Sequence, residues 1–360
     1  MNFPVCMCRQ PRAVAAAILT ILLGVAGCAT NSSPTPRSTR FRFGESVVLA
    51  GEESAGLAFA PLVSVADVRS SYLDKQAGTI HYEAGRDYII DLQTGRIKRT
   101  AQSRIPDFAK NLLYGREDFD HSKFPGYGNG NYFVFVDYLA KHKPAWPAQP
   151  SQAALLPKAR KKLVQGEKLT LVAFGDSITA GGEASRPGLI YWQRWADELK
   201  QKYPRAEIVA RNGATGGDTT ANGLDRLQSK VLDQHPDLVL IAFGMNDNNI
   251  RPFGVPVETF ASNLRTMVDR IRSQTQAEII LVSAFRPNPK WHFGSGNMEQ
   301  YARATEQVAR EKQCAFADVY HNWLAISASK KPEDLLGNNI NHPNDFGHWI
   351  YFQVLDDLGL

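Results

Sequence analysis

Short apolar runs and longer amphipathic stretches alternate along the second half of the chain. The apolar runs have strand length, and the segments between them have apolar residues at helical spacing. The runs lie at Leu169–Phe174, Glu207–Ala210, Leu238–Phe243, Glu278–Ala284 and Ala315–Asp318. The helical segments lie at Tyr191–Lys202, Thr220–Gln234, Val257–Ser273, Met298–Lys312 and Asp345–Leu358. This alternation predicts an α/β domain over residues 167–360, with a parallel sheet covered on both faces.

Residues 41–143 have a different pattern, in which β-prone runs are separated by turn signals and no long amphipathic helix intervenes. The runs lie at Ser46–Ala50, Thr79–Tyr82, Tyr88–Leu92 and Tyr132–Tyr138. We therefore predict a small β-rich domain, a sandwich, over 41–143. Its aromatic residues either bind polysaccharide or form the core of the domain, and the usual burial of aromatic rings favours the core. The aromatic residues in question are Tyr114, Phe124, Tyr127 and Tyr132.

A proline-rich segment, Pro144–Pro157, separates the two patterns. Such composition is typical of an exposed boundary, so we predict a linker at residues 144–166. The glycine-rich segment 126–130 lies before it. No strand precedes this segment, no helix follows it, and no Lys-Ser/Thr pair closes it, so it predicts a turn rather than a phosphate loop.

The first 27 residues have the pattern of a secretory leader. Two arginines precede an apolar stretch, Ala13–Leu23, that is too short for a stable membrane span. Val25–Cys28 resembles the lipobox of bacterial lipoproteins, and the alternative is an ordinary leader with a chance cysteine. The resemblance implies cleavage before Cys28, acylation there, and an extracytoplasmic, lipid-anchored protein (at the outer membrane in a Gram-negative cell). Residues 28–40, rich in Ser, Pro and Thr, then form a lipidated tether.

Charge and cysteine content exclude several classes of function. Lys and Arg number 41 and Asp and Glu 36, a formal net charge of +5 that is too small and too evenly spread to indicate nucleic acid as a partner. Two of the four cysteines lie in the leader, so Cys28 and Cys314 cannot form a disulfide framework. No Cys/His cluster has the spacing of a zinc site. Cys314 is expected to be a buried thiol.

The stretch Gly175–Thr179 follows the first apolar run of the α/β region and presents a serine where ligands bind in open α/β sheets. A serine hydroxyl is a poor nucleophile unless a base removes its proton. His342, in a turn-rich segment before the last helix, is the candidate base for Ser177. Taken alone, His342 is better interpreted as an ordinary loop histidine, because chain separation says nothing about proximity.

Acyl transfer also requires donors aimed at the developing oxyanion. The candidates are the N–H of Ser177, the N–H of Gly213, which has no Cβ to block substrate, and the side-chain amide of Asn246. Gly213 could instead be an ordinary strand-end turn, and Asn246 could bond its own backbone. Their occurrence together, each at the end of a predicted strand, favours the catalytic interpretation.

These residues resemble the four blocks of the SGNH (GDSL-like) hydrolase superfamily, in a carbohydrate-esterase-like form. The blocks are Gly175–Thr179, Asn212–Gly213, Gly244–Asp247 and His342–Pro343. The resemblance covers roughly the second half of the chain. It implies a flavodoxin-like three-layer fold and a serine esterase mechanism without metal or organic cofactor. It also implies that Ser177 is the nucleophile, His342 the base, and Ser177, Gly213 and Asn246 the oxyanion hole.

One position departs from the family pattern. The family usually has Asp three residues before the histidine, and this chain has Asn339 there. A neutral amide can orient an imidazole but cannot stabilise imidazolium by charge. We expect a Ser–His dyad in which Asn339 or a backbone carbonyl orients His342. Asp334 or Asp345 could instead reach the ring, or catalysis could be weak.

The favoured substrate is a small acyl ester, most simply acetate on a polysaccharide. Arg286 and Trp291, on the loop after the fourth predicted strand, are candidate substrate contacts, although Trp291 could merely anchor that loop. One alternative is a lipolytic esterase or thioesterase for longer acyl chains. The other is a non-catalytic glycan-binding envelope protein, which the Asn339 departure keeps open.

Overall fold

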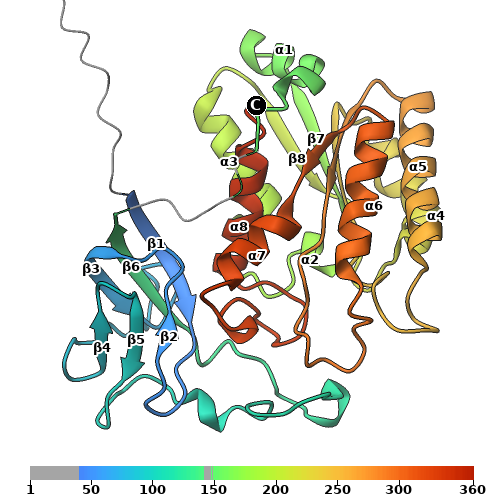
Figure 1. Cartoon of the computed structure of the whole chain (residues 1–360). Helices are drawn as coiled ribbons and strands as arrows, with labels where there is room; N and C mark the ends of the chain where they lie inside the picture. The colour runs from blue at the N-terminus through green and yellow to red at the C-terminus, as the bar shows by residue number, and fades with distance from the viewer. Residues whose placement is uncertain (1–39, 142–146, 148) are drawn as a thin grey trace, which may run out of the picture. The chain divides into compact units, whose positions relative to one another are not determined.

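In the computed structural model, which describes residues 40–141, 147 and 149–360, a five-stranded parallel sheet crosses the second half of the chain (Figure 1). Its strands are β7 (Leu169–Gly175), β8 (Ile208–Asn212), β9 (Leu238–Ala242), β10 (Glu278–Val282) and β11 (Ala315–Ala317). The lateral order is β8-β7-β9-β10-β11. Counted along this region, that is 2-1-3-4-5, the flavodoxin-like order. The predicted α/β fold is confirmed.

Helices cover both faces of this sheet (Figure 1). On one face α3 (Tyr191–Lys202) packs on α8 (Asp345–Asp356). On the other, α5 (Val257–Gln274) lies between α4 (Thr220–Lys230) and α6 (Met298–Glu311). Crossover connections between parallel strands are right-handed, so the direction in which the chain moves across the sheet decides which face its helices cover. The chain moves in one direction from β7 to β8 and in the opposite direction from β9 to β11, which places helices on both faces.

The remaining helices are short, and two of them were not predicted. The two helices that were not predicted are α1 (Pro157–Gln165), whose only buried residues are Ala159 and Leu163, and α7 (Val319–Ser327). Four of the nine residues of α1 are charged and two of its apolar residues are buried, so its sequence shows little helical periodicity. The 3-10 helices are η1 (Phe108–Lys110), η2 (His121–Lys123), η3 (Ala153–Leu155), η4 (Pro187–Leu189), η5 (Leu232–Gln234) and η6 (Pro332–Asp334).

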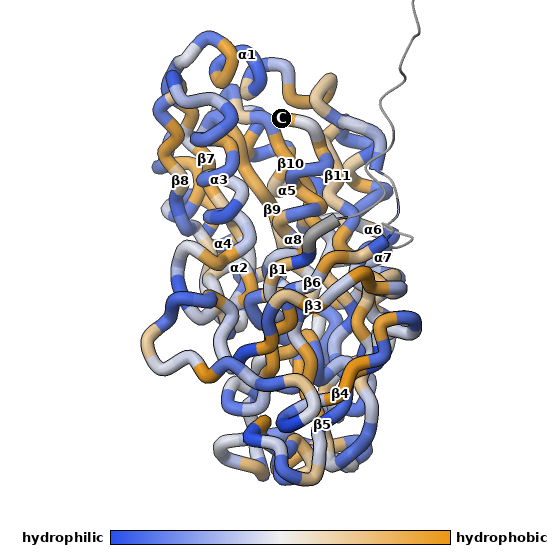
Figure 2. The backbone as a smooth tube through the Cα atoms, turned by 90° about the vertical axis from the view of Figure 1, so that its left-hand side faces the viewer, coloured by the Kyte–Doolittle hydropathy of each residue, from blue (hydrophilic) through white to orange (hydrophobic). Residues whose placement is uncertain are grey.

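The central strands are apolar throughout because both of their faces are buried. Every residue of β7 and β9 is buried, whereas the edge strand β8 is partly exposed. Figure 2 shows hydrophobic colour among the strands of this sheet. Cys314, next to β11, is 4% exposed and burial raises the pKa of its thiol to about 11. The expectation of a buried thiol is confirmed.

The N-terminal region consists of two three-stranded antiparallel sheets. One has the order β1-β6-β3, with β1 (Arg40–Val47), β6 (Val134–Ala140) and β3 (Leu62–Arg69). The other has the order β2-β5-β4, with β2 (Ala55–Gly56), β5 (Arg96–Arg99) and β4 (Tyr88–Asp91). The β-rich prediction is confirmed. The predicted strand Thr79–Tyr82 is wrong, since His81 makes only an isolated bridge to Arg69.

Strand β1 is bonded to the segment that carries His342. The Ser46 hydroxyl donates to the Asp334 carbonyl at 2.6 Å, and the Val48 N–H donates to the Asp334 carboxylate at 2.8 Å. The Asn344 amide in turn donates to the Ser46 hydroxyl at 2.9 Å. Buried apolar residues of both regions also belong to one connected cluster. The N-terminal sheet therefore supports the turn around His342 from both of its ends.

The predicted leader, Cys28 and most of the tether lie outside the described residues. Within the ranges that are described, no helix combines the length and apolar character needed to cross a membrane. The division into domains at residues 144–166 stays a prediction.

Candidate active site

Ser177 lies where the strand order of the parallel sheet reverses. Strand β7 ends at Gly175, and the short helix α2 (Ser177–Ala180) begins at the serine itself. The Asp176 carboxylate accepts the Ile178 N–H at 3.0 Å and caps this helix, as an acidic N-cap is expected to do. A Cβ at Gly175 would lie 2.4 Å from the Ala242 carbonyl oxygen, so only glycine permits this close approach of β7 and β9.

The structure brings Ser177 and His342 together. The Ser177 Oγ lies 2.7 Å from the His342 Nε2 across 165 residues of chain. Gly182 packs on the other side of the ring, where a Cβ would lie only 3.1 Å from Nδ1. The second histidine of the region, His348, is buried and bonds the Gly182 carbonyl instead, 3.2 Å away. Of these two histidines, His342 is the one whose ring is hydrogen-bonded to Ser177.

A side-chain-stabilised turn presents His342. The Asn338 carboxamide oxygen accepts three consecutive backbone N–H groups, at 2.9 to 3.0 Å, from Ile340, Asn341 and His342. The Gly337 N–H donates to the His342 carbonyl at 2.9 Å and closes the loop. Sequence reasoning did not single out Asn338, although asparagine at the start of a turn-rich segment is the signal that could have done so.

No acidic partner orients the His342 ring. Within the described part of the chain, no hydrogen bond reaches Nδ1, and burial alone lowers the pKa of His342 to about 4. The Asp334 carboxylate accepts the Val48 N–H, and the Asp345 carboxylate accepts the Ser185 N–H at 2.9 Å. Both carboxylates thus accept backbone N–H groups of other segments, and neither of the two proposed acids hydrogen-bonds to the His342 imidazole.

Asn339 does not contact the His342 ring either, which corrects the predicted role as its orienter. Its backbone has φ +61°, in the left-handed region, and its side chain is 1% exposed. Its carbonyl accepts the Asn288 amide at 2.9 Å, while its own carboxamide oxygen has no hydrogen-bond partner among the described residues. Backbone geometry, rather than a bond to the imidazole, accounts for asparagine at this position.

The predicted oxyanion donor Gly213 is corrected by the structure. Its N–H donates to the Ala173 carbonyl at 2.8 Å and is therefore committed to the sheet. The turn that follows lies closer to the serine, since a Cβ at Gly216 would be 3.9 Å from the Ser177 Cβ. Gly217, with φ +79°, is exposed in this turn, and no other atom lies within 4 Å of where its Cβ would be.

Asn246 connects the third predicted block to this turn. One N–H of its side-chain amide donates to the Asp218 carbonyl at 2.9 Å, directly after Gly217. The neighbouring Asp247 carboxylate accepts the Thr220 N–H at 3.0 Å and fixes the start of α4. No hydrogen bond of the second amide N–H of Asn246 is found among the described residues. Asn246 and the turn at Gly217 thus lie together at this edge of the sheet, and the role predicted for Asn246 stays a prediction.

The two predicted substrate contacts have different environments. Trp291 is 7% exposed, and its indole N–H donates to the His121 Nδ1 at 3.1 Å. It packs with Leu113, Phe119 and Ile340, so it anchors its loop and offers no ring face to a substrate. Arg286 is exposed and stays a candidate contact.

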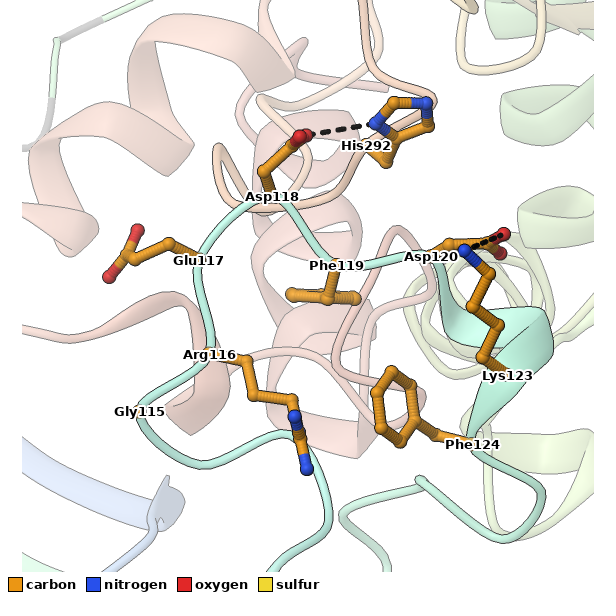
Figure 3. Close-up of a pocket in the computed structure, with 9 residues that line it drawn as sticks. All are labelled: Gly115, Arg116, Glu117, Asp118, Phe119, Asp120, Lys123, Phe124 and His292. Carbon is orange, nitrogen blue, oxygen red and sulfur yellow. Dashed lines mark hydrogen bonds and ion pairs between the residues drawn. The ribbon is translucent and has the colours of Figure 1, made fainter.

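A pocket of about 540 Å³ lies along the segment Gly115–Phe124 and is closed by His292 (Figure 3). Two pairs of polar groups lie along it, the Asp118 carboxylate with His292 Nδ1 at 2.9 Å and the Asp120 carboxylate with the Lys123 ammonium at 3.8 Å. The Arg116 guanidinium covers the Phe124 ring at 4.3 Å. None of Ser177, Asn246 and His342 lines this pocket, so we do not assign it to the chemistry.

A serine paired with a histidine at the carboxyl edge of a flavodoxin-like sheet defines a hydrolytic enzyme of the α/β class. Residues 173–350 match the GDSL-like lipase/acylhydrolase family. The chain therefore carries a domain of this SGNH family, whose members are carboxylic ester hydrolases, and the recognition made from the sequence is confirmed.

Three relatives illustrate the breadth of this similarity. An arylesterase of Vibrio mimicus is 29% identical over 193 residues, covering 52% of this chain and 87% of the relative. The acetylxylan esterase of Geobacillus stearothermophilus is 27% identical over 206 residues, covering 52% and 92%. The crystal structure of that esterase superposes with a TM-score of 0.47 at 26% identity, covering 53% and 94%. The uncharacterized lipoprotein YqeF of Bacillus subtilis is 25% identical over 220 residues, covering 52% and 88%.

Proposed function

We propose that this protein is a serine esterase that removes O-acetyl groups from a polysaccharide. The observation that carries the proposal is the 2.7 Å contact between the Ser177 hydroxyl and the His342 imidazole. Similarity to an acetylxylan esterase supports acetate as the acyl group and a glycan as its carrier. The β-rich region, which a small-ester hydrolase does not need, is consistent with a polymeric substrate.

In the first half of the reaction His342 Nε2 takes the proton of Ser177 as the Oγ attacks the ester carbonyl carbon. Negative charge then develops on the carbonyl oxygen. We assign its stabilisation to the N–H groups of Ser177 and Gly217 and to the free amide N–H of Asn246. The tetrahedral intermediate collapses as the bond to the sugar oxygen breaks and the imidazolium protonates that oxygen, which releases the sugar hydroxyl and leaves an acetyl-serine.

In the second half His342 removes a proton from water, which attacks the acetyl-serine and releases acetate. The imidazolium that forms in each half has no carboxylate beside it. Gly182 and the turn held by Asn338 fix the orientation of the ring in place of a third catalytic side chain. The site is therefore proposed to operate as a Ser–His dyad.

We expect the esterase activity of a Ser177–His342 dyad to persist at acidic pH. His342 acts as a base only when neutral, and its pKa is lowered to about 4. As pH falls, kcat/KM on a small chromogenic acetate should stay constant through pH 6 and reach half its maximum near pH 4. Circular dichroism at each pH monitors folding. A decline centred near the usual histidine pKa of about 6.5 would mean that the ring is solvated or paired with an acid.

The acyl group is tested by the dependence of rate on chain length. A site built for acetate should release acetate from an acetylated glycan and from a small acetate ester. It should lose at least about tenfold in kcat/KM for each step from acetate to butyrate and hexanoate, because added methylenes clash with a small acyl site. Rates that rise with chain length would instead identify a lipolytic esterase or thioesterase.

We also propose that the protein is lipid-anchored at a bacterial membrane. The support is the lipobox-like Val25–Cys28 segment and the similarity to the lipoprotein YqeF. Acyl chains contribute about 0.8 kcal/mol per buried CH₂, so several chains suffice to hold a protein at a membrane. Mass spectrometry of the mature N-terminus tests this, and a chain that begins anywhere other than an acylated Cys28 would contradict it.

A further inference from the structure

Four aromatic side chains from three separate segments form a continuous row, which we call the aromatic rim. Its members, in order, are Tyr127, His121, Phe293 and Phe253. Neighbouring ring centroids are 5.4, 5.8 and 6.1 Å apart, with interplanar angles of 74°, 82° and 82°. The rings therefore present faces and edges alternately along the row.

One end of the aromatic rim lies beside the His342 turn. Two residues after Tyr127, the Asn129 N–H donates to the Gly337 carbonyl at 2.7 Å. The Gly337 N–H itself donates to the His342 carbonyl at 2.9 Å. Backbone bonds thus connect the glycine-rich segment 126–130 to the residue we assign as the base.

The other end lies beside the oxyanion side of the site. The Ile250 N–H donates to the Phe293 carbonyl at 2.9 Å, and the Phe253 N–H donates to the Ile250 carbonyl at 3.0 Å. Ile250 follows Asn246 by four residues. The aromatic rim thus extends from the segment that holds His342 to the segment that holds Asn246, which are the two sides of the proposed site.

The aromatic rim is exposed to solvent on one side and packs against a buried cluster on the other. Phe253 is 62% exposed, the highest value for a large hydrophobic side chain in the described part of the protein, and the other three rings are partly exposed. Beneath them lies the buried cluster that contains Trp291. The Trp291 indole N–H donates to the His121 Nδ1, which leaves the proton of a neutral His121 on Nε2 as a hydrogen-bond donor.

We infer that the aromatic rim binds the glycan chain of a neutral polysaccharide next to the sugar that carries the acetyl group. This inference rests on the proposed function. Pyranose rings present a face of C–H bonds that packs on the electron-rich face of an aromatic ring, while hydroxyl groups at their edges need donors such as His121. Because the rings are not coplanar, they fit a single twisted chain rather than the flat surface of a crystalline polymer.

The charge around the aromatic rim favours a neutral glycan over an acidic one. Asp120, next to His121 in the chain, pairs with Lys123 at 3.8 Å, whereas burial and the negative charge of Glu183 raise the pKa of Tyr127. A uronic acid bound beside Tyr127 would be repelled by the Glu183 carboxylate. Neutral sugars such as those of xylan or mannan backbones meet no such barrier.

The test compares a polymer with a small ester on the full chain. Phe253→Ala should lower kcat/KM on acetylated glucomannan roughly threefold to tenfold, the loss expected for one aromatic contact, and leave 4-nitrophenyl acetate within about twofold. Phe253→Tyr should retain the polymer rate. Ile89→Ala, which removes another highly exposed apolar side chain from β4 (51% exposed), is the matched control and should change neither rate.

Several outcomes would overturn the inference. A ratio of polymer to small-ester activity that Phe253→Ala leaves unchanged would do so, as would faster hydrolysis of acetylated polygalacturonan than of glucomannan. A lower mass of Phe253→Ala than wild type in sedimentation would assign the aromatic rim to self-association. Failure of the wild type on every ester would instead remove the proposed function itself, so the two failures are distinguishable.

Discussion

Replacing the serine, Ser177→Ala, should abolish hydrolysis of acetate esters, with kcat reduced roughly 10⁴-fold or more. The reason is chemical, since the hydroxyl that bonds His342 at 2.7 Å is the group proposed to form the acyl-enzyme. His342→Ala should lose a comparable factor, because without the base the hydroxyl keeps its proton. The measurement is release of chromophore from 4-nitrophenyl acetate under saturating substrate, with unfolding curves recorded for each variant.

Two further variants make this result specific. Because Ser177 and His342 act as one unit, the double alanine variant should be no slower than either single variant. Asn246→Ala removes one proposed oxyanion donor and should lose only about 10²–10³ in kcat. Activity of Ser177→Ala near that of the wild type would contradict the mechanism, and additive losses in the double variant would show that the two residues act independently.

Replacing one buried lysine, Lys330→Met, should destabilise the protein by about 3–5 kcal/mol. The Lys330 ammonium lies 2.8 Å from the Glu45 carboxylate, and both side chains are fully buried. Glu45 also accepts bonds from the Tyr138 hydroxyl and from the Ala58 N–H, the latter at 2.7 Å. Removing the lysine takes away the ammonium group that pairs with this carboxylate in a low-dielectric interior. Urea unfolding followed by circular dichroism measures the free energy of unfolding.

The adjacent lysine provides a matched control. Lys331 also pairs with a glutamate, Glu53, at 3.0 Å, but both side chains are more than half exposed. Lys331→Met should therefore change the free energy of unfolding by no more than about 1 kcal/mol. The double variant Glu45→Gln with Lys330→Met should recover much of the lost stability, since no unpaired charge remains. Equal costs for the two lysines would show that burial does not decide the effect.

The buried pair also bears on catalysis, because it joins β1 to the segment that leads to the His342 turn. Glu45 is next in sequence to Ser46, which bonds both Asp334 and Asn344. Loss of the pair should thus loosen the turn as well as the sheet. The N-terminal region is in this sense a structural part of the hydrolase site, whatever glycan contacts its aromatic residues make.

Much of the fold could be predicted because the central strands are buried on both faces. A fully buried strand such as Leu169–Phe174 can be told from a helical segment by the short length of its apolar run. The structure places β7 within one residue of this prediction. The β-rich region was harder to divide into strands. Strand β3, with Ser64 and Asp67 among its apolar residues, has one partly exposed face and an irregular register, so its alternation is weak.

The sequence by itself determined the parallel sheet, the serine at its carboxyl edge and the histidine before the last helix, because each is encoded within a few neighbouring residues. Only the tertiary structure decided that Gly213 is committed to Ala173, that Trp291 is buried, and that no acidic side chain among the described residues hydrogen-bonds to His342. Each of these outcomes depends on which partner a group finds across a long stretch of chain. Burial and hydrogen-bond commitment are properties of that packing, and local sequence does not encode them.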